Sequence, residues 1–128
     1  MKLIGIALIG MLASGMVIAD VDLTNGTALL QNCKNMIAIE KQFELDRLSV
    51  LGAGQCLGVV QGVRNTLVTL ANAKLISPVI CFPGGGVLSN GQTIRVVVKY
   101  LEDNPKDLNL DQSLLTMMAL LDAFPCKS

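Results

Sequence analysis

SNGQTIRVVVKYLEDNP, residues 89–105, is the stretch that decides the fold, because its three consecutive valines and its isoleucine have the composition of a β-strand. The spacing of its apolar residues is nevertheless helical. A strand would place Arg95 and Val97 on the same face, whereas a helix separates them. Apolar side chains at positions i, i+3, i+4 and i+7 share one helix face; here they are Ile94, Val97, Val98 and Leu101.

Both ends of this stretch carry helix-boundary signals. Ser89 followed three positions later by Gln92 is typical of a capping box, in which the two side chains satisfy free backbone N–H groups. Pro105 disfavours the α conformation at the residue before it, Asn104. The sequence therefore predicts a helix from about Asn90 to Asp103.

Three further segments have helical periodicity. The first is TALLQNCKNMIAIEKQF, from Thr27 to Phe43; the second runs from about Gln55 to Lys74; the last begins near Asn109 or Asp111 and ends at Pro125. The predicted buried positions are Leu29, Leu30, Cys33, Met36 and Ile37 in the first, Cys56, Val59, Val60, Val63, Leu67, Leu70 and Ala71 in the second, and Leu114, Met117, Met118 and Leu121 in the last. Four amphipathic helices predict an all-α fold, a small helical bundle stapled by disulfides.

The chain opens with the pattern of a signal peptide. Lys2 is followed by an uncharged apolar run and by small residues up to Ala19, which predicts cleavage before Asp20. The alternative is a retained membrane anchor, but the apolar stretch is at the short limit of the roughly 17 to 25 residues that span a bilayer. We therefore expect a signal peptide over residues 1–19 and a single exported domain over residues 20–128.

Four cysteines lie in the exported part, and an even number in a small secreted domain indicates two disulfides. Three pairings are possible. We favour Cys33 with Cys56 and Cys81 with Cys126, because each pair then brackets one helical hairpin. A metal site is disfavoured, since no two of these cysteines have the close C-x-x-C spacing of tetrahedral sites.

Composition excludes several classes of function. Residues 20–128 keep all the acidic residues and all but one of the basic ones, so a basic surface for nucleic acid or anionic lipid is not indicated. The sequence contains no histidine, which excludes Ser-His and Cys-His nucleophilic catalysis. We therefore expect no catalytic residue, no cofactor and no metal, and a protein that is not an enzyme.

Three glycines in the second helix, Gly54, Gly58 and Gly62, each cost up to about 1 kcal/mol of helix propensity relative to alanine. Close approach of another helix would offset that cost, either within the domain or across a dimer, and both interpretations stay open. The same region superficially matches a dinucleotide-binding turn. That interpretation fails because no acidic residue lies between Asp46 and Glu102 to hold a ribose.

Several motifs together resemble the Rap/Tai family of immunity proteins associated with type VI secretion. They are CLGVVQGV in the second helix, the cysteine just before Pro83, NGQTIRVVVKYLEDNPKDLNL from residue 90, and ALLDAFPC at the end of the last helix. The resemblance covers roughly Leu29 to Cys126.

This resemblance implies an exported, mostly helical protein that dimerises in the periplasm and blocks a peptidoglycan amidase injected by a neighbouring cell. Inhibition of that kind needs no catalysis, in agreement with the missing histidine. By resemblance, the loop after the V-V-x-Y-L helix inserts into the amidase cleft, and the outward face of that helix adds contacts at the rim. The implied partner-binding residues are Asp103, Asn104, Lys106 and Asp107 in the loop, with Arg95 and Lys99 at the rim.

An alternative function is a general periplasmic binding or chaperone-like protein that uses an apolar groove between helices. Flexible methionines suit such surfaces; those outside the predicted signal peptide are Met36, Met117 and Met118.

Overall fold

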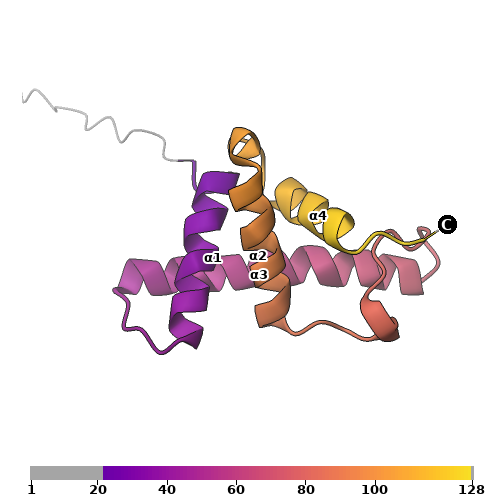
Figure 1. Cartoon of the computed structure of the whole chain (residues 1–128), viewed down its shortest axis with the longest axis horizontal. Helices are drawn as coiled ribbons and strands as arrows, with labels where there is room; N and C mark the ends of the chain where they lie inside the picture. The colour runs from indigo at the N-terminus through magenta and orange to yellow at the C-terminus, as the bar shows by residue number, and fades with distance from the viewer. Residues whose placement is uncertain (1–21, 128) are drawn as a thin grey trace, which may run out of the picture.

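Residues 22–127 are described by a computed structural model, in which four α-helices and two short 3₁₀ turns follow one another (Figure 1). Their bounds are α1 Gly26–Glu40, α2 Arg47–Asn72, η1 Pro83–Gly85, α3 Asn90–Asp103, η2 Pro105–Asp107 and α4 Gln112–Ala123. Within this part of the chain the structure contains no β-strand, which confirms the predicted all-α fold. No helix in it has the length and apolarity needed to cross a bilayer. The predicted signal peptide lies outside the described residues.

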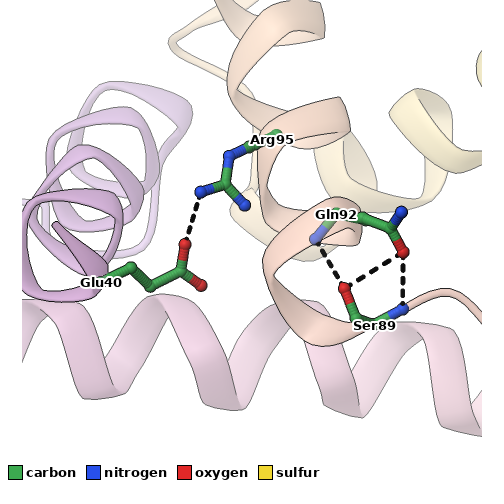
Figure 2. Close-up of polar contacts among 4 residues, drawn as sticks. All are labelled: Glu40, Ser89, Gln92 and Arg95. Atoms are coloured by element: carbon green, nitrogen blue, oxygen red, sulfur yellow. Dashed lines mark hydrogen bonds and ion pairs between the residues drawn. The ribbon is translucent and has the colours of Figure 1, made fainter.

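The stretch rich in valines is helix α3, with the predicted bounds Asn90–Asp103. The Ser89 hydroxyl accepts a hydrogen bond from the Gln92 backbone N–H at 3.2 Å, and the Gln92 side chain accepts one from the Ser89 N–H at 3.2 Å (Figure 2). This completes the predicted capping box. The four predicted apolar positions of the helix are all buried.

Helix α2 begins at Arg47, earlier than the predicted start near Gln55. Asp46 is the reason, because its carboxylate accepts hydrogen bonds from the backbone N–H groups of Leu48 and Ser49 and so caps the helix. The glycines that follow do not interrupt it. The 26 residues of α2 extend about 39 Å at 1.5 Å per residue, and α1 and α3 cross this long helix side by side (Figure 1).

All four helices contribute to one hydrophobic core. Ten buried residues form it: Leu29 and Cys33 from α1, Cys56 and Val60 from α2, Ile94, Val97, Val98 and Leu101 from α3, and Leu115 and Ala119 from α4.

The predicted buried face of α4 was wrong. Leu114 is 40% exposed, whereas Leu115 and Leu120 are fully buried. The helix has leucine or methionine on both faces, so its periodicity fits two neighbouring stripes equally well. The stripe with the small Ala119 faces the core.

The structure pairs Cys33 of α1 with Cys56 of α2. It also pairs Cys81, which precedes α3, with Cys126, which follows α4. This is the pairing favoured from the sequence. The Cα atoms of the two pairs are 5.1 and 4.9 Å apart.

The glycines at positions 54, 58 and 62 do not pack against another helix of the protomer. A Cβ added at any of the three would meet no atom within 4 Å, so tight packing inside the domain was the wrong interpretation. The close contact lies elsewhere in α2, at Gly52, where an added Cβ would collide with the Asn32 side chain of α1. The three glycines therefore lie on an open face of α2.

Candidate partner-binding surface

The loop predicted to bind a partner is held firmly against the end of α3. Asn104 donates a side-chain hydrogen bond to the carbonyl oxygen of Tyr100 at 2.8 Å, which satisfies one of the free carbonyls at the helix C-terminus. Pro105 then begins η2, and the Asp107 N–H donates to the Asn104 carbonyl at 3.0 Å. Asn104 thus acts as a positioning residue in the loop.

The far side of the loop is tied to the start of α1. The backbone N–H groups of Gly26 and Thr27 donate to the carbonyls of Leu110 and Leu108, at 3.0 and 3.1 Å. The Gln112 N–H donates to Thr24 at 2.7 Å. Because both of its ends are anchored, the loop from Asp103 to Asp111 presents its charges in a fixed arrangement.

The charged residues of this region form one pair at the end of α3, Lys99 and Asp103, and a second group in the turn that follows, Lys106 and Asp107. Lys99 forms an ion pair with Asp103 at 2.8 Å, and both side chains are largely exposed. The hydrogen bond to the Asp103 carboxylate, together with its charge, raises the pKa of Lys99. Lys106 is exposed and Asp107 half-buried in the adjoining turn. The structure therefore brings five of the six predicted residues together.

Arg95 is the sixth, and it is engaged elsewhere. Its guanidinium forms an ion pair with Glu40 at the end of α1, at 2.7 Å (Figure 2). Lys34 and Glu102 form a second pair between the same two helices at 2.9 Å. Arg95 therefore helps to hold α1 against α3, one turn away from Lys99.

A cleft of about 440 Å³ opens between α3 and α4 beside this loop; we call it the α3–α4 cleft. Its lining residues include Val96, Tyr100, Asp103, Asn104, Ala119 and Asp122. Burial of the phenol raises the pKa of Tyr100, and the nearby carboxylates of Asp107 and Asp122 add to the effect.

Sequence reasoning missed both Tyr100 and Asp122 as parts of this surface. Tyr100 is the only tyrosine in the chain and follows Lys99 directly, which was an available signal. The position of Asp122 depends on how α4 packs on α3, and no local pattern specifies that packing.

Sequence reasoning also missed Arg64, a buried residue with an exposed fraction of only 7%. Its guanidinium donates to the Leu88 carbonyl at 3.1 Å and to the Asn90 side chain at 3.0 Å. It also donates to the Asn65 side chain at 3.1 Å and to the Thr93 hydroxyl at 3.3 Å. Arg64 thus links α2 to the start of α3.

A second surface is the outer face of α2, defined here by Leu51, Gly54, Gly58, Gly62 and Thr69. Leu51 is 72% exposed, and an apolar groove of about 490 Å³ separates this face from Leu114 and Met117 of α4. Between Leu48 and the end of α2 the one charged residue is the buried Arg64. The exposed side of a long helix therefore carries no charge over most of its length.

A family model for Rap1a immunity proteins matches residues 25–126. No curated protein and no solved structure matches the chain.

Proposed function

We propose, from the premise that this chain belongs to the family of Rap1a immunity proteins, that it protects the periplasm of its cell by binding a peptidoglycan amidase delivered through type VI secretion. The family match over residues 25–126 carries this proposal. Bound inhibitor would cover the substrate cleft of the amidase, so that peptide crosslinks of the cell wall stay uncut.

Two features of the protein support this location and mode of action. Disulfides form and persist in oxidising compartments such as the periplasm, and this chain has two of them. The charged loop from Asp103 to Asp107 is anchored by hydrogen bonds at both ends. An ordered loop of this kind suits insertion into a partner, because it loses little conformational entropy on binding. Lys99 and Arg95, on the adjacent face of α3, are proposed as rim contacts that mainly set the association rate.

Affinity capture tests the proposal. The oxidised protein from Asp20 to Ser128 is immobilised and exposed to the secreted proteins of its own and neighbouring strains. We expect recovery of one small amidase in near-equimolar amount, whose wall-cleaving activity falls to zero at equivalence. Recovery of many unrelated chains would instead favour the chaperone-like alternative.

Charge reversal at the loop tests the assigned binding residues. Asp103→Lys combined with Asp107→Lys is expected to weaken amidase binding at least tenfold, or ~1.4 kcal/mol, because complementary charges would become repulsive. The control is Glu44→Lys, which reverses an exposed charge in the connection between α1 and α2, away from the loop. Equal affinity of both variants would overturn the loop assignment and leave the family assignment intact.

We also propose that the protein is a homodimer whose protomers pair through the outer face of α2. Gly58 lies near the middle of this helix, so antiparallel pairing about a twofold axis there places Gly54 of one protomer opposite Gly62 of the other. Close approach of two helices would offset the helix-propensity cost of the three glycines. The uncharged surface and the neighbouring apolar groove support this pairing.

Light scattering after size exclusion tests the dimer. The unchanged protein is expected to elute as a dimer and Gly58→Arg as a folded monomer, because the long charged side chain blocks close approach. Gln31→Arg on the exposed face of α1 is the control and is expected to stay dimeric. A monomeric unchanged protein at tens of micromolar would contradict the proposal.

A further inference from the structure

The α3–α4 cleft lies where two helices end together with acidic residues. Asp103 is the last residue of α3, and Asp122 lies in the last turn of α4. Neither helix has a basic residue in its last turn. Because a helix C-terminus carries partial negative charge, cations are the residues that stabilise it and carboxylates do the opposite. The free protein therefore concentrates negative potential at this cleft.

Not all of this charge is neutralised within the protein. Lys99 is paired with Asp103. The carboxylates of Asp107 and Asp122 form no ion pair among residues 22–127. Asp122 lines the cleft, whereas Asp107 lies outside its lining and adds negative charge on the side of the loop. Lys99 also lines the cleft, but its ammonium group is engaged by Asp103, so a second cation would meet the carboxylate of Asp122, which forms no ion pair among residues 22–127.

The cleft also offers apolar surface. Val96 is half-buried and Ala119 is fully buried beneath the cleft, and the Tyr100 ring contributes an aromatic wall. A side chain with an aliphatic stem and a cationic head buries the stem on such a surface while the head meets the carboxylates. Arginine fits better than lysine, because its planar guanidinium stacks on aromatic rings and binds a carboxylate through two parallel hydrogen bonds.

We infer that the α3–α4 cleft is a receptor for an arginine side chain of the protein partner, with the guanidinium between Asp122 and the Tyr100 ring. The inference rests on the proposed function and deepens it, because it states which chemistry on the partner lies beside the inserted loop. The loop and the cleft share Asp103 and Asn104, so a single approach of the partner fills both.

Titration with a small probe tests this inference without the partner. The ¹⁵N-labelled oxidised protein, residues 20–128, is titrated with Nα-acetyl-arginine amide and followed by NMR. Saturable shifts are expected at the backbone amides of Val96, Tyr100, Ala119 and Asp122. Nα-acetyl-citrulline amide has nearly the same shape without the charge and is expected to bind at least tenfold more weakly.

Variants distinguish the cleft from general attraction to acidic surface. Asp122→Asn is expected to weaken binding of the arginine probe at least threefold, and Tyr100→Phe, which keeps the ring, is expected to leave it nearly unchanged. Glu44→Gln removes an exposed carboxylate outside the cleft and is the matched control. Equal binding of the citrulline and arginine probes, or an unaltered response of Asp122→Asn, would overturn the inference.

The probe result and the capture result are independent. Probe binding in the cleft without a captured amidase would leave the arginine receptor standing and count against the proposed function. Capture of an amidase whose affinity is the same for Asp122→Asn and the unchanged protein, with no probe binding, would overturn the receptor alone.

Discussion

Cys33 and Cys56 are fully buried where α1 and α2 cross, whereas Cys81 is exposed and Cys126 half-buried at the molecular surface. The first disulfide is part of a core that four helices already form. The second holds residues 73–88, the connection between α2 and α3, onto the end of α4. The two disulfides therefore serve regions with very different amounts of packing.

The connection from residue 73 to residue 88 has little core of its own. Ile80 is its one buried residue, while Leu75 and Val87 are more than two-thirds exposed. Its contacts with the end of α4 include a hydrogen bond from the Cys81 N–H to the Phe124 carbonyl at 2.9 Å and the edge-to-face packing of the Phe82 ring on the Phe124 ring. The Cys81–Cys126 disulfide therefore holds this connection in place, whereas burial of apolar side chains holds the helices together.

Removal of the buried disulfide is the change with the largest expected effect. Cys33→Ala combined with Cys56→Ala is expected to lower the free energy of unfolding by about 4 kcal/mol, because a closed loop is opened and buried sulfur contacts are lost. Urea unfolding followed by circular dichroism measures it. A cost below ~1 kcal/mol would show that the helix core does not depend on this link.

Arg64 connects the two regions, and its loss is expected to be the next most costly. Arg64→Met leaves the Leu88 carbonyl, the Asn90 side chain and the Thr93 hydroxyl without a donor, at an expected cost of about 3 kcal/mol. Urea unfolding measures the cost. Arg64→Lys keeps the charge without the planar fork and is expected to recover less than half of the loss. Full recovery by lysine would mean that charge alone matters at this position.

Removal of the surface disulfide is expected to cost about 2 kcal/mol, the low end of the usual range, because the connection that it frees buries little. Hydrogen exchange of Cys81→Ala combined with Cys126→Ala should show lost protection in residues 80–88 and retained protection in α3. Loop-closure entropy alone would make the surface disulfide the more stabilising of the two, since it closes a loop of 45 residues and the buried disulfide one of 23. If this variant is the less stable of the two, chain entropy outweighs burial.

Ser89 lies at the junction where the connection enters α3. Ser89→Ala removes the oxygen that caps the helix and is expected to cost about 1 kcal/mol. Ser89→Asp keeps an acceptor at the cap and is expected to lie within a few tenths of a kcal/mol of the unchanged protein. Equal losses in the two variants would show that the cap does not account for the effect.

Asp46 at the start of α2 carries the smallest effect, and it depends on pH. Hydrogen bonds from the Ser49 N–H and hydroxyl lower the pKa of its carboxyl from 3.8. As pH falls, the unfolded chain therefore takes up this proton first. The stabilising contribution is complete above about pH 4 and is lost as pH falls through the folded-state pKa.

Asp46→Asn keeps a capping oxygen that does not titrate. Its free energy of unfolding should fall less than that of the unchanged protein between about pH 5 and pH 2, as measured by urea unfolding. Parallel curves for the two proteins would contradict the assigned role of the carboxylate.

Local patterns predicted the parts of the fold that local physics determines. The spacing of Ile94, Val97, Val98 and Leu101, with its caps, specified α3 completely, because polar residues occupy its other face. The start of α2 was missed because a run with several glycines has low helix propensity, which the Asp46 cap and the packing of α2 override.

Features that depend on how helices meet were beyond local patterns. Two equivalent stripes on α4 left its buried face undetermined. The open glycine face of α2 and the burial of Arg64 follow from where α1 and α3 cross α2. The same holds for the candidate partner-binding surface: resemblance to a known family indicated the loop, whereas the cleft beside it is defined only once α4 is placed against α3.

For the proposed location in the periplasm, the disulfide topology has a consequence for the order in which the cysteines are oxidised. Each cysteine bonds to the next one along the chain, so the two closed loops, 33–56 and 81–126, neither overlap nor nest. When a polypeptide enters an oxidising compartment with its N-terminus first, the first two thiols to meet are then already native partners. Their oxidation leaves a single possible pairing for the second two. Such a chain reaches its native bonds by sequential oxidation and has no need of a disulfide isomerase to correct shuffled pairs.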